Sequence, residues 1–161
     1  MRNLLVSSAL LFVLSGQLPG AQSELGGIQL FDGYRVNRGS AVDAEVWTIE
    51  GTNGLKILFE AGLNEGSWAN PDDRNKYSWY REQKIRGYGV RYALVRPGLK
   101  TQWEPRQSRG LPPGNILLVT FLLEGAKSDY TANFVGKVAS SEERADALLM
   151  IGTFDPSKGN F

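Results

Sequence analysis

The sequence predicts an α+β domain in which an antiparallel, twisted sheet carries a C-terminal helix on one face. Short runs rich in β-branched and aromatic residues alternate with glycines, as in strands joined by turns. One segment after residue 140 has the start signal and spacing of a helix. The chain contains no cysteine, so its core must be held by packing without disulfides. An all-β sandwich is the alternative fold.

Seven runs are predicted to be strands. The clearest alternation places Leu55, Ile57 and Phe59 on one face of a strand and Lys56 and Glu60 on the other. This pattern indicates one face in the core and one toward water. The predicted strands are Ile28–Val36, Ala44–Ile49, Leu55–Glu60, Tyr77–Ile85, Tyr88–Val95, Ile116–Leu123 and Thr131–Val138.

Two of these strand regions carry further expectations. The run Ile116–Leu123 is apolar on both faces, so we expect it at the centre of the sheet, covered on each side. A buried helix segment is the alternative, but its short length and flanking glycines favour a strand. The stretch Tyr77–Val95 predicts one long β-hairpin that turns near Arg86-Gly87. It places on a single face the side chains of Tyr88, Val90, Tyr92 and Leu94.

A helix is predicted over residues 141–151, ending near Gly152. Ser140 and Glu143 form a capping box, in which each side chain satisfies a backbone N–H at the start of the helix. The residues that we expect to form the apolar stripe against the sheet are Ala145, Leu148, Leu149 and Ile151.

Residues 1–23 are predicted to be a cleaved signal peptide. A basic residue precedes an apolar run over residues 4–14, and small residues follow at 20–23. A membrane anchor is the alternative, but a spanning helix needs about 20 apolar residues, and Ser15-Gly16 end this run early. We therefore expect a single mature domain of residues 24–161 that is periplasmic or secreted, with no transmembrane segment.

The absence of histidine and cysteine excludes several chemistries. A Ser-His-Asp triad, a Cys-His pair and a zinc site with nitrogen and sulfur ligands cannot be built. Carboxylate pairs, tyrosine or arginine acid–base pairs and oxygen-ligated metals remain possible. The acidic stretch Asn70–Asn75 lacks the spacing of an EF-hand loop, so we interpret it as a turn. We expect no metal and no cofactor.

Basic residues concentrate in the middle of the chain. Residues 71–109 contain ten basic and four acidic residues, whereas residues 24–70 contain three basic and seven acidic residues. Arginines interleaved with aromatic rings can bind an anionic ligand or a partner protein. The alternative is a hairpin with its aromatic residues in the core and its basic residues on the solvated face. Because the expected mature domain is neutral, nucleic acid is not an expected partner. The candidate arginines are Arg81, Arg86, Arg91 and Arg96.

The four tryptophans separate by context. Trp47 and Trp79 lie in predicted strands, and we expect them in the core. Trp68 and Trp103 lie in the predicted loops Gly62–Lys76 and Pro97–Asn115, so they are candidates for stacking on a sugar ring. A loop tryptophan that plugs the end of a sheet is the alternative.

The segment Ala132–Phe154 resembles the closing unit of the PsbP-like fold. It combines a strand ending in Gly-x-Val, an acidic-capped helix and a short tail that contains phenylalanine. Gly54–Ile57 and Trp79–Gln83 also resemble strands of uncharacterised exported bacterial proteins. The PsbP-like resemblance covers about a sixth of residues 24–161. It implies an antiparallel sheet with a helix packed against it and a non-catalytic accessory role, and it assigns no functional residue.

We therefore expect an exported, non-catalytic binding module that contacts an envelope protein or an anionic glycan through residues 77–109. A small hydrolase or lyase that uses Glu82, Glu104 and neighbouring arginines is the alternative. Such an enzyme requires a concave pocket in which a carboxylate with a raised pKa faces Arg or Tyr. A purely structural role requires that the arginine side chains lie apart.

Overall fold

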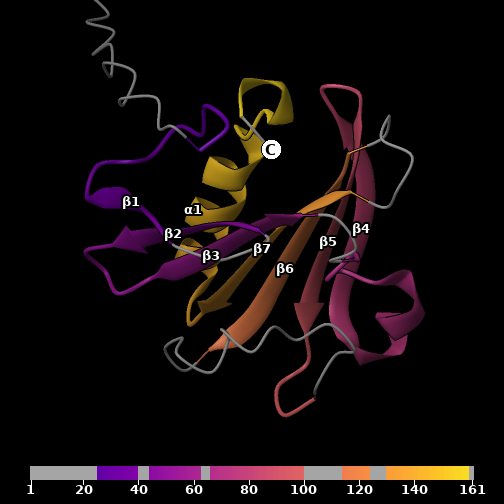
Figure 1. Ribbon diagram of the computed structural model, residues 1–161. Coiled ribbons are helices and arrows are strands. Elements are labelled where there is room, and N and C mark those ends of the chain that lie inside the picture. Colours follow the sequence, from indigo (N-terminus) through magenta and orange to yellow (C-terminus); the bar gives the residue numbers. More distant parts are fainter. Residues whose placement is uncertain (1–24, 40–43, 63–65, 100–113, 124–129, 160–161) are drawn as a thin grey trace, which may run out of the picture.

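Figure 1 presents the computed structural model, which describes residues 25–39, 44–62, 66–99, 114–123 and 130–159. The predicted signal peptide and Trp103 lie outside these residues. The strands are β1 (Tyr34–Arg38), β2 (Glu45–Gly51), β3 (Lys56–Gly62), β4 (Tyr77–Ile85), β5 (Tyr88–Val95), β6 (Asn115–Leu122) and β7 (Thr131–Val138). The helices are α1 (Ser141–Gly152) and the short 3-10 helices η1 (Pro71–Lys76) and η3 (Pro156–Lys158).

The seven described strands form one sheet in the order β1-β2-β3-β7-β6-β5-β4, and every neighbouring pair is antiparallel. The sheet twists from one edge to the other, and α1 lies across one face (Figure 1). The predicted antiparallel sheet with a C-terminal helix is therefore confirmed. The predicted bounds of β4, β5 and β7 coincide with the observed ones.

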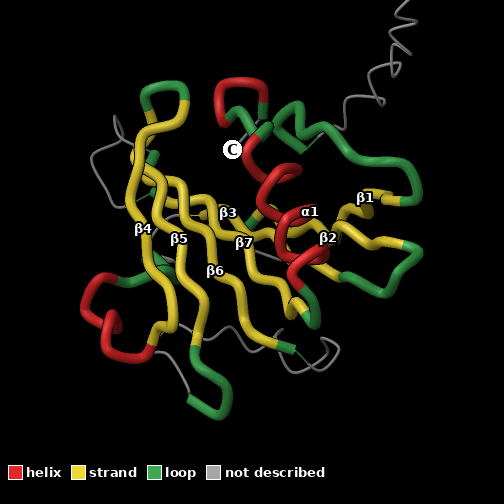
Figure 2. The backbone as a smooth tube through the Cα atoms, turned by 180° about the vertical axis from the view of Figure 1, so that it is seen from behind, coloured by secondary structure: helices red, strands yellow, loops and turns green. Residues whose placement is uncertain are grey.

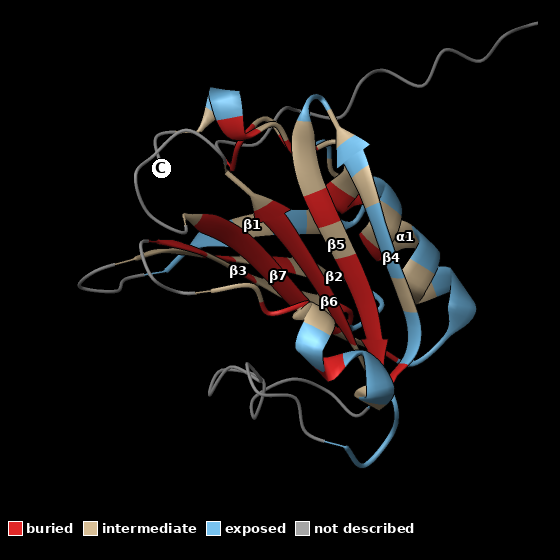
Figure 3. Ribbon diagram, turned by 90° about the vertical axis from the view of Figure 1, so that its right-hand side faces the viewer, coloured by how far each residue is buried: buried red, intermediate tan, exposed pale blue. Residues whose placement is uncertain are grey.

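The interior position of β6 agrees with its apolar sequence. Its residues from Leu117 to Phe121 are buried on both faces (Figure 3). β7 is the middle strand, and β6 lies beside it. The predicted first strand is wrong at its start. The prediction starts it at Ile28, but β1 begins at Tyr34, because Gly33 adopts a positive φ angle of 84° and the Tyr34 N–H donates to the Phe31 carbonyl at 3.1 Å in a turn just before the strand.

The main core lies between the sheet and α1. Phe59, Phe121 and Phe134 project from three neighbouring strands and are fully buried. The ring of Phe154, just after α1, packs on all three at centroid distances of 5.5, 5.0 and 5.1 Å. Edge and tilted contacts of this kind add to the free energy gained by burying the rings. This cluster fixes the end of α1 against the middle of the sheet.

The buried face of α1 differs from the predicted one. The predicted cap is present in a shifted form: Ser140 Oγ accepts from the Glu143 N–H at 3.1 Å, whereas the Glu143 side chain accepts at 2.6 Å from the N–H of Ala139, one residue before the cap. The predicted burial of Leu149 is wrong, because this side chain is 61 % exposed, and Ala145 of the predicted stripe is exposed as well. The face that meets the sheet follows the i, i+3, i+4, i+7 spacing and consists of Ala147, Met150, Ile151 and Phe154.

The other face of the sheet is covered by the connection from β3 to β4. Because these strands are separated by β7, β6 and β5, the chain must pass over them. Trp68 and Ala69 pack on Leu118 and Val135 in a second core. The stretch predicted as a loop also contains η1, whose first turn is capped by the Asn70 side chain accepting from the Asp72 N–H at 3.0 Å.

A buried polar network attaches this connection to the sheet. Asn133 Oδ1 accepts from the Trp68 N–H at 3.2 Å and from the Thr120 hydroxyl at 2.7 Å. Asn133 Nδ2 donates to the Gly66 carbonyl at 3.1 Å, and Thr120 Oγ1 accepts from the Ala69 N–H at 3.1 Å. Buried backbone groups that cross a sheet face have no ladder partner, and these side chains supply one.

Thr120→Val is expected to lower the free energy of unfolding by about 1–3 kcal/mol, because the Ala69 N–H loses its partner in a buried site. Thr48→Val is the matched control, because Thr48 is half-buried on β2 and its hydroxyl has no partner among the described residues. It should change stability by no more than about 0.5 kcal/mol. Urea unfolding at constant m-value measures both, and equal effects would contradict the role of the network.

Met150→Ala and Leu149→Ala test the orientation of α1. Truncating the fully buried Met150 should cost about 2–5 kcal/mol. Truncating the exposed Leu149 next to it should cost less than about 0.5 kcal/mol. Thermal unfolding distinguishes the two variants, and a larger loss for Leu149→Ala would restore the predicted stripe.

Candidate ligand-binding groove

The four predicted arginines do not form one patch. On the β4–β5 hairpin, Arg81 pairs opposite Tyr92 on the α1 side of the sheet, whereas Arg91 pairs opposite Glu82 on the other side. Arg86 lies at the tip of the hairpin and Arg96 follows its other end. The arrangement therefore separates these side chains, as the structural alternative requires.

Arg86 binds the end of α1. The predicted turn at Arg86-Gly87 is confirmed, and both residues have positive φ angles, 49° and 88°. Arg86 Nη1 donates to the carbonyls of Gly152 at 3.1 Å and Phe154 at 3.2 Å. A cation at the C-terminal end of a helix also opposes the negative end of its dipole. Arg86 therefore holds the hairpin tip against α1.

Arg91 belongs to a closed cluster on the opposite face. Glu82 accepts from Arg74 Nη2 at 3.1 Å, from the Tyr80 hydroxyl, and lies 3.7 Å from Arg91 Nε. Arg74 also lies over the Tyr80 ring at 4.5 Å, and that ring stacks on Tyr77. The hydrogen bond from Tyr80 and the neighbouring Arg74 hold the pKa of Glu82 below its ordinary value.

The pKa of Glu82 is shifted in the opposite direction to the one that the hydrolase alternative requires. An acid catalyst requires a raised pKa in a concave site, but the Glu82 side chain is 47 % exposed and lines neither of the two hollows described below. Glu104, the other carboxylate of that alternative, lies outside the described residues.

Arg81 differs from its neighbours. Between residues 71 and 99, where every residue is described, the chain has five arginines. Arg74 and Arg91 pair with Glu82, while Arg86 and Arg96 donate to backbone carbonyls. Arg81 forms no ion pair and donates to no described residue. Its exposed guanidinium is therefore available to a ligand.

Arg81 lies in a groove between β4 and α1. In Figure 2, α1 runs along the middle of the sheet, and β4 is the strand at the uncovered edge. The groove has a volume of about 210 Å³ and ends near Gly152. The side chains that line it are those of Trp79, Arg81, Gln83, Ile85, Tyr92 and Leu148. Alternate residues of β4 point to the same face, so four of these six come from one strand.

A β-bulge places Trp79 in this groove. Tyr77 pairs with Val95 and Trp79 with Leu94, so Ser78 is the extra residue. The bulge moves Trp79 to the α1 side, whereas Tyr77 is buried in the second core. The prediction that Trp79 lies in the core is therefore wrong, because it is 36 % exposed at an edge that α1 does not cover. Its ring lies 6.1 Å from the Tyr92 ring, tilted by 50°.

Gln83 is held with its carbonyl oxygen free. Its Nε2 donates to the Tyr92 hydroxyl at 3.0 Å. Burial raises the pKa of Tyr92, so this tyrosine stays protonated at neutral pH. Gln83 Oε1 has no partner among the described residues and can accept from a ligand hydroxyl.

Trp68 has no open ring face. It is 3 % exposed and belongs to the second core, as the plugging alternative described. The sequence could not indicate this burial, because Trp68 lies in a segment predicted to be a loop. No pattern in the sequence indicates that Gln83 and Leu148 line the same groove, because their proximity depends on how α1 crosses the sheet.

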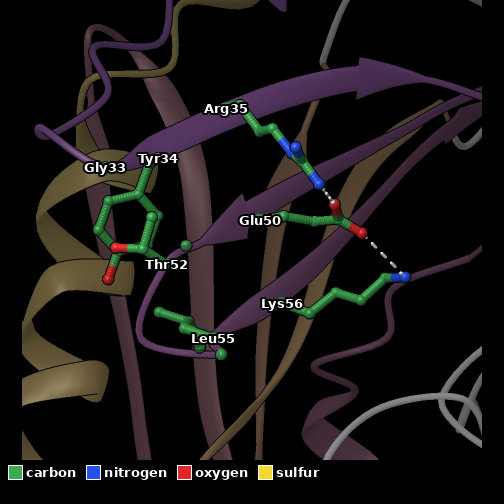
Figure 4. A pocket seen from close by; sticks show the side chains of 9 residues that line it. Gly33, Tyr34, Arg35, Glu50, Thr52, Leu55 and Lys56 are labelled. Carbon is green, nitrogen blue, oxygen red and sulfur yellow. Dashed lines mark hydrogen bonds and ion pairs between the residues drawn. The ribbon is translucent and has the colours of Figure 1, made fainter.

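A second hollow lies where β1, β2 and β3 meet at the opposite edge (Figure 4). Its volume is about 470 Å³, but both of the cations that line it are already paired with one carboxylate. Glu50 binds Arg35 at 3.0 Å and Lys56 at 3.2 Å, and these contacts lower its pKa. The β4–α1 groove, with an unpaired cation, is the stronger candidate.

Comparison of the chain with family models, curated proteins and solved structures finds no match. The PsbP-like resemblance thus stays a prediction. Within the described ranges, no helix is both long enough and apolar enough to cross a membrane. Asn70 and Asp73 of the acidic stretch serve as a cap and as the partner of Lys76, whose Nζ lies 2.7 Å from Asp73.

Tyr80→Phe should raise the pKa of Glu82 toward its ordinary value of 4.5, because the hydroxyl that stabilises the carboxylate is removed. A pKa lowered by folding contributes stability above that ordinary value, and the contribution is lost as the pH falls through the folded-state pKa. NMR titration of the side-chain carboxyl measures the change. A Glu82 pKa above 4.5 in the wild type would instead favour the hydrolase alternative.

Proposed function

We propose that the protein is an exported, non-catalytic binding module that holds an anionic envelope component in the groove between β4 and α1. The observation that carries this proposal is the exposed, unpaired Arg81 beside the exposed Trp79 ring. Among the described residues that line the groove, none is acidic. A guanidinium without an internal partner gains more from an anion than one already bound to a carboxylate.

The location follows from the predicted signal peptide over residues 1–23. The accessory role implied by the PsbP-like resemblance and the α+β class agree with a module that acts by contact. An anionic component fits the groove better than a protein surface. A volume of about 210 Å³ accommodates one small chemical group rather than the many side chains of a protein interface.

Sedimentation of the purified protein with the insoluble envelope fraction of a Gram-negative bacterium tests the proposal. Arg81→Gln should weaken retention roughly tenfold or more, because a charge-assisted hydrogen bond is lost. Trp79→Ala should weaken it independently. Lys84→Gln is the matched control, since Lys84 is exposed on the same strand but points to the opposite face.

Equal retention of all four proteins, or none for the wild type, would refute the groove as the binding site. Near-ultraviolet circular dichroism establishes that each variant is folded. High salt should release the wild type, because exposed charge pairs are screened.

A further inference from the structure

We infer that the ligand of the β4–α1 groove is a sugar ring that carries a carboxylate, such as a hexuronic acid unit of an anionic glycan. This inference rests on the proposed function and specifies the chemistry of its ligand. Three features of the groove lead to it: an exposed indole, a cation two residues along the same strand, and an oriented amide.

The indole of Trp79 provides a flat apolar surface. Its ring face carries the negative part of the aromatic quadrupole, and the C–H groups on one face of a sugar ring are weakly positive. The Tyr92 ring at 6.1 Å and the Leu148 side chain border this surface. A simple anion such as phosphate would leave the indole without a contact, so the groove favours an anion attached to a ring.

Arg81 lies on the same face as Trp79, two residues further along β4. Such residues are separated by about 7 Å along a strand. A ring stacked on the indole can therefore direct a substituent toward the guanidinium. A planar guanidinium matches a carboxylate with two parallel hydrogen bonds.

The position of the groove relative to α1 disfavours an anion with more than one negative charge. Leu148 and Gly152 belong to the last turns of the helix, where the dipole is negative. Phosphate sites commonly use the opposite, N-terminal end of a helix. A monoanionic carboxylate held by one arginine suits this end better than a dianionic phosphate.

Gln83 provides the third feature, the oriented amide. Because its Nε2 is bound to the Tyr92 hydroxyl, its carbonyl oxygen is oriented and can accept from a sugar hydroxyl. The volume of about 210 Å³ equals roughly seven water molecules at ~30 Å³ each, which suits one substituted ring. Drug-sized ligands occupy larger pockets of about 300 Å³ or more.

Titration with oligogalacturonate, followed by tryptophan fluorescence and calorimetry, tests the inference. The wild type and Lys84→Gln should bind with the same affinity. Arg81→Gln should weaken binding roughly tenfold or more. The fully methyl-esterified oligomer keeps the ring and removes the charge, so it should bind the wild type as weakly as the acid binds Arg81→Gln. Phosphatidylglycerol vesicles supply phosphate without a stacking ring and should not compete.

Failure of this inference and failure of the proposed function give different results. Groove-dependent envelope retention without oligogalacturonate binding would overturn the acidic sugar and leave the binding module. Competition by the phosphatidylglycerol vesicles would likewise overturn the sugar in favour of a phosphate headgroup. Retention abolished by protease treatment of the envelope would assign a protein partner instead. Equal losses of affinity for Arg81→Gln and Lys84→Gln would show that oligogalacturonate binds by nonspecific charge attraction, and would overturn the site.

Discussion

The buried network around Asn133 is the constraint on which the rest of the structure depends. The connection from β3 to β4 must cross three strands, and its backbone cannot join the ladder beneath it. Asn133 and Thr120 offer that backbone an acceptor for each of two N–H groups and a donor for the Gly66 carbonyl. With these bonds the connection can carry Trp68 into the second core. Without them, the apolar residues of β6 and β7 would face water.

The same connection determines where the candidate site lies. It delivers the chain through η1 to the far edge of the sheet, and Tyr77 enters the second core at the start of β4. The bulge at Ser78 then directs Trp79 to the opposite face. On that face, the phenylalanine cluster fixes α1 over the middle strands and Arg86 ties its end to the hairpin tip. The groove is the space that these restraints leave beside the edge strand.

Local patterns predicted the strands, the hairpin turn and the capping box, because each depends on neighbouring residues. The long-range features could not be predicted in this way. Nothing in the local sequence distinguishes Asn133 and Thr120, because their role appears only when a segment more than 50 residues away packs on them. Trp79 was misplaced because one extra residue inverts the alternation that a strand pattern assumes. Leu149 was misplaced because every residue from Ala147 to Ile151 is apolar, so two different sets with i, i+3, i+4 spacing fit the sequence and only packing selects between them.

The contrast between two neighbouring positions of β4 explains why the groove, and not the most charged cluster, is the functional candidate. Glu82 is bound by two arginines and a tyrosine hydroxyl, and these interactions lower its pKa. A group in that state has little free energy to gain from a ligand. Arg81, one residue earlier and on the other face, has no such partner among the described residues. The density of charge in the sequence therefore favours the Glu82 cluster, whereas the absence of internal compensation favours the groove beside Arg81 as the candidate site.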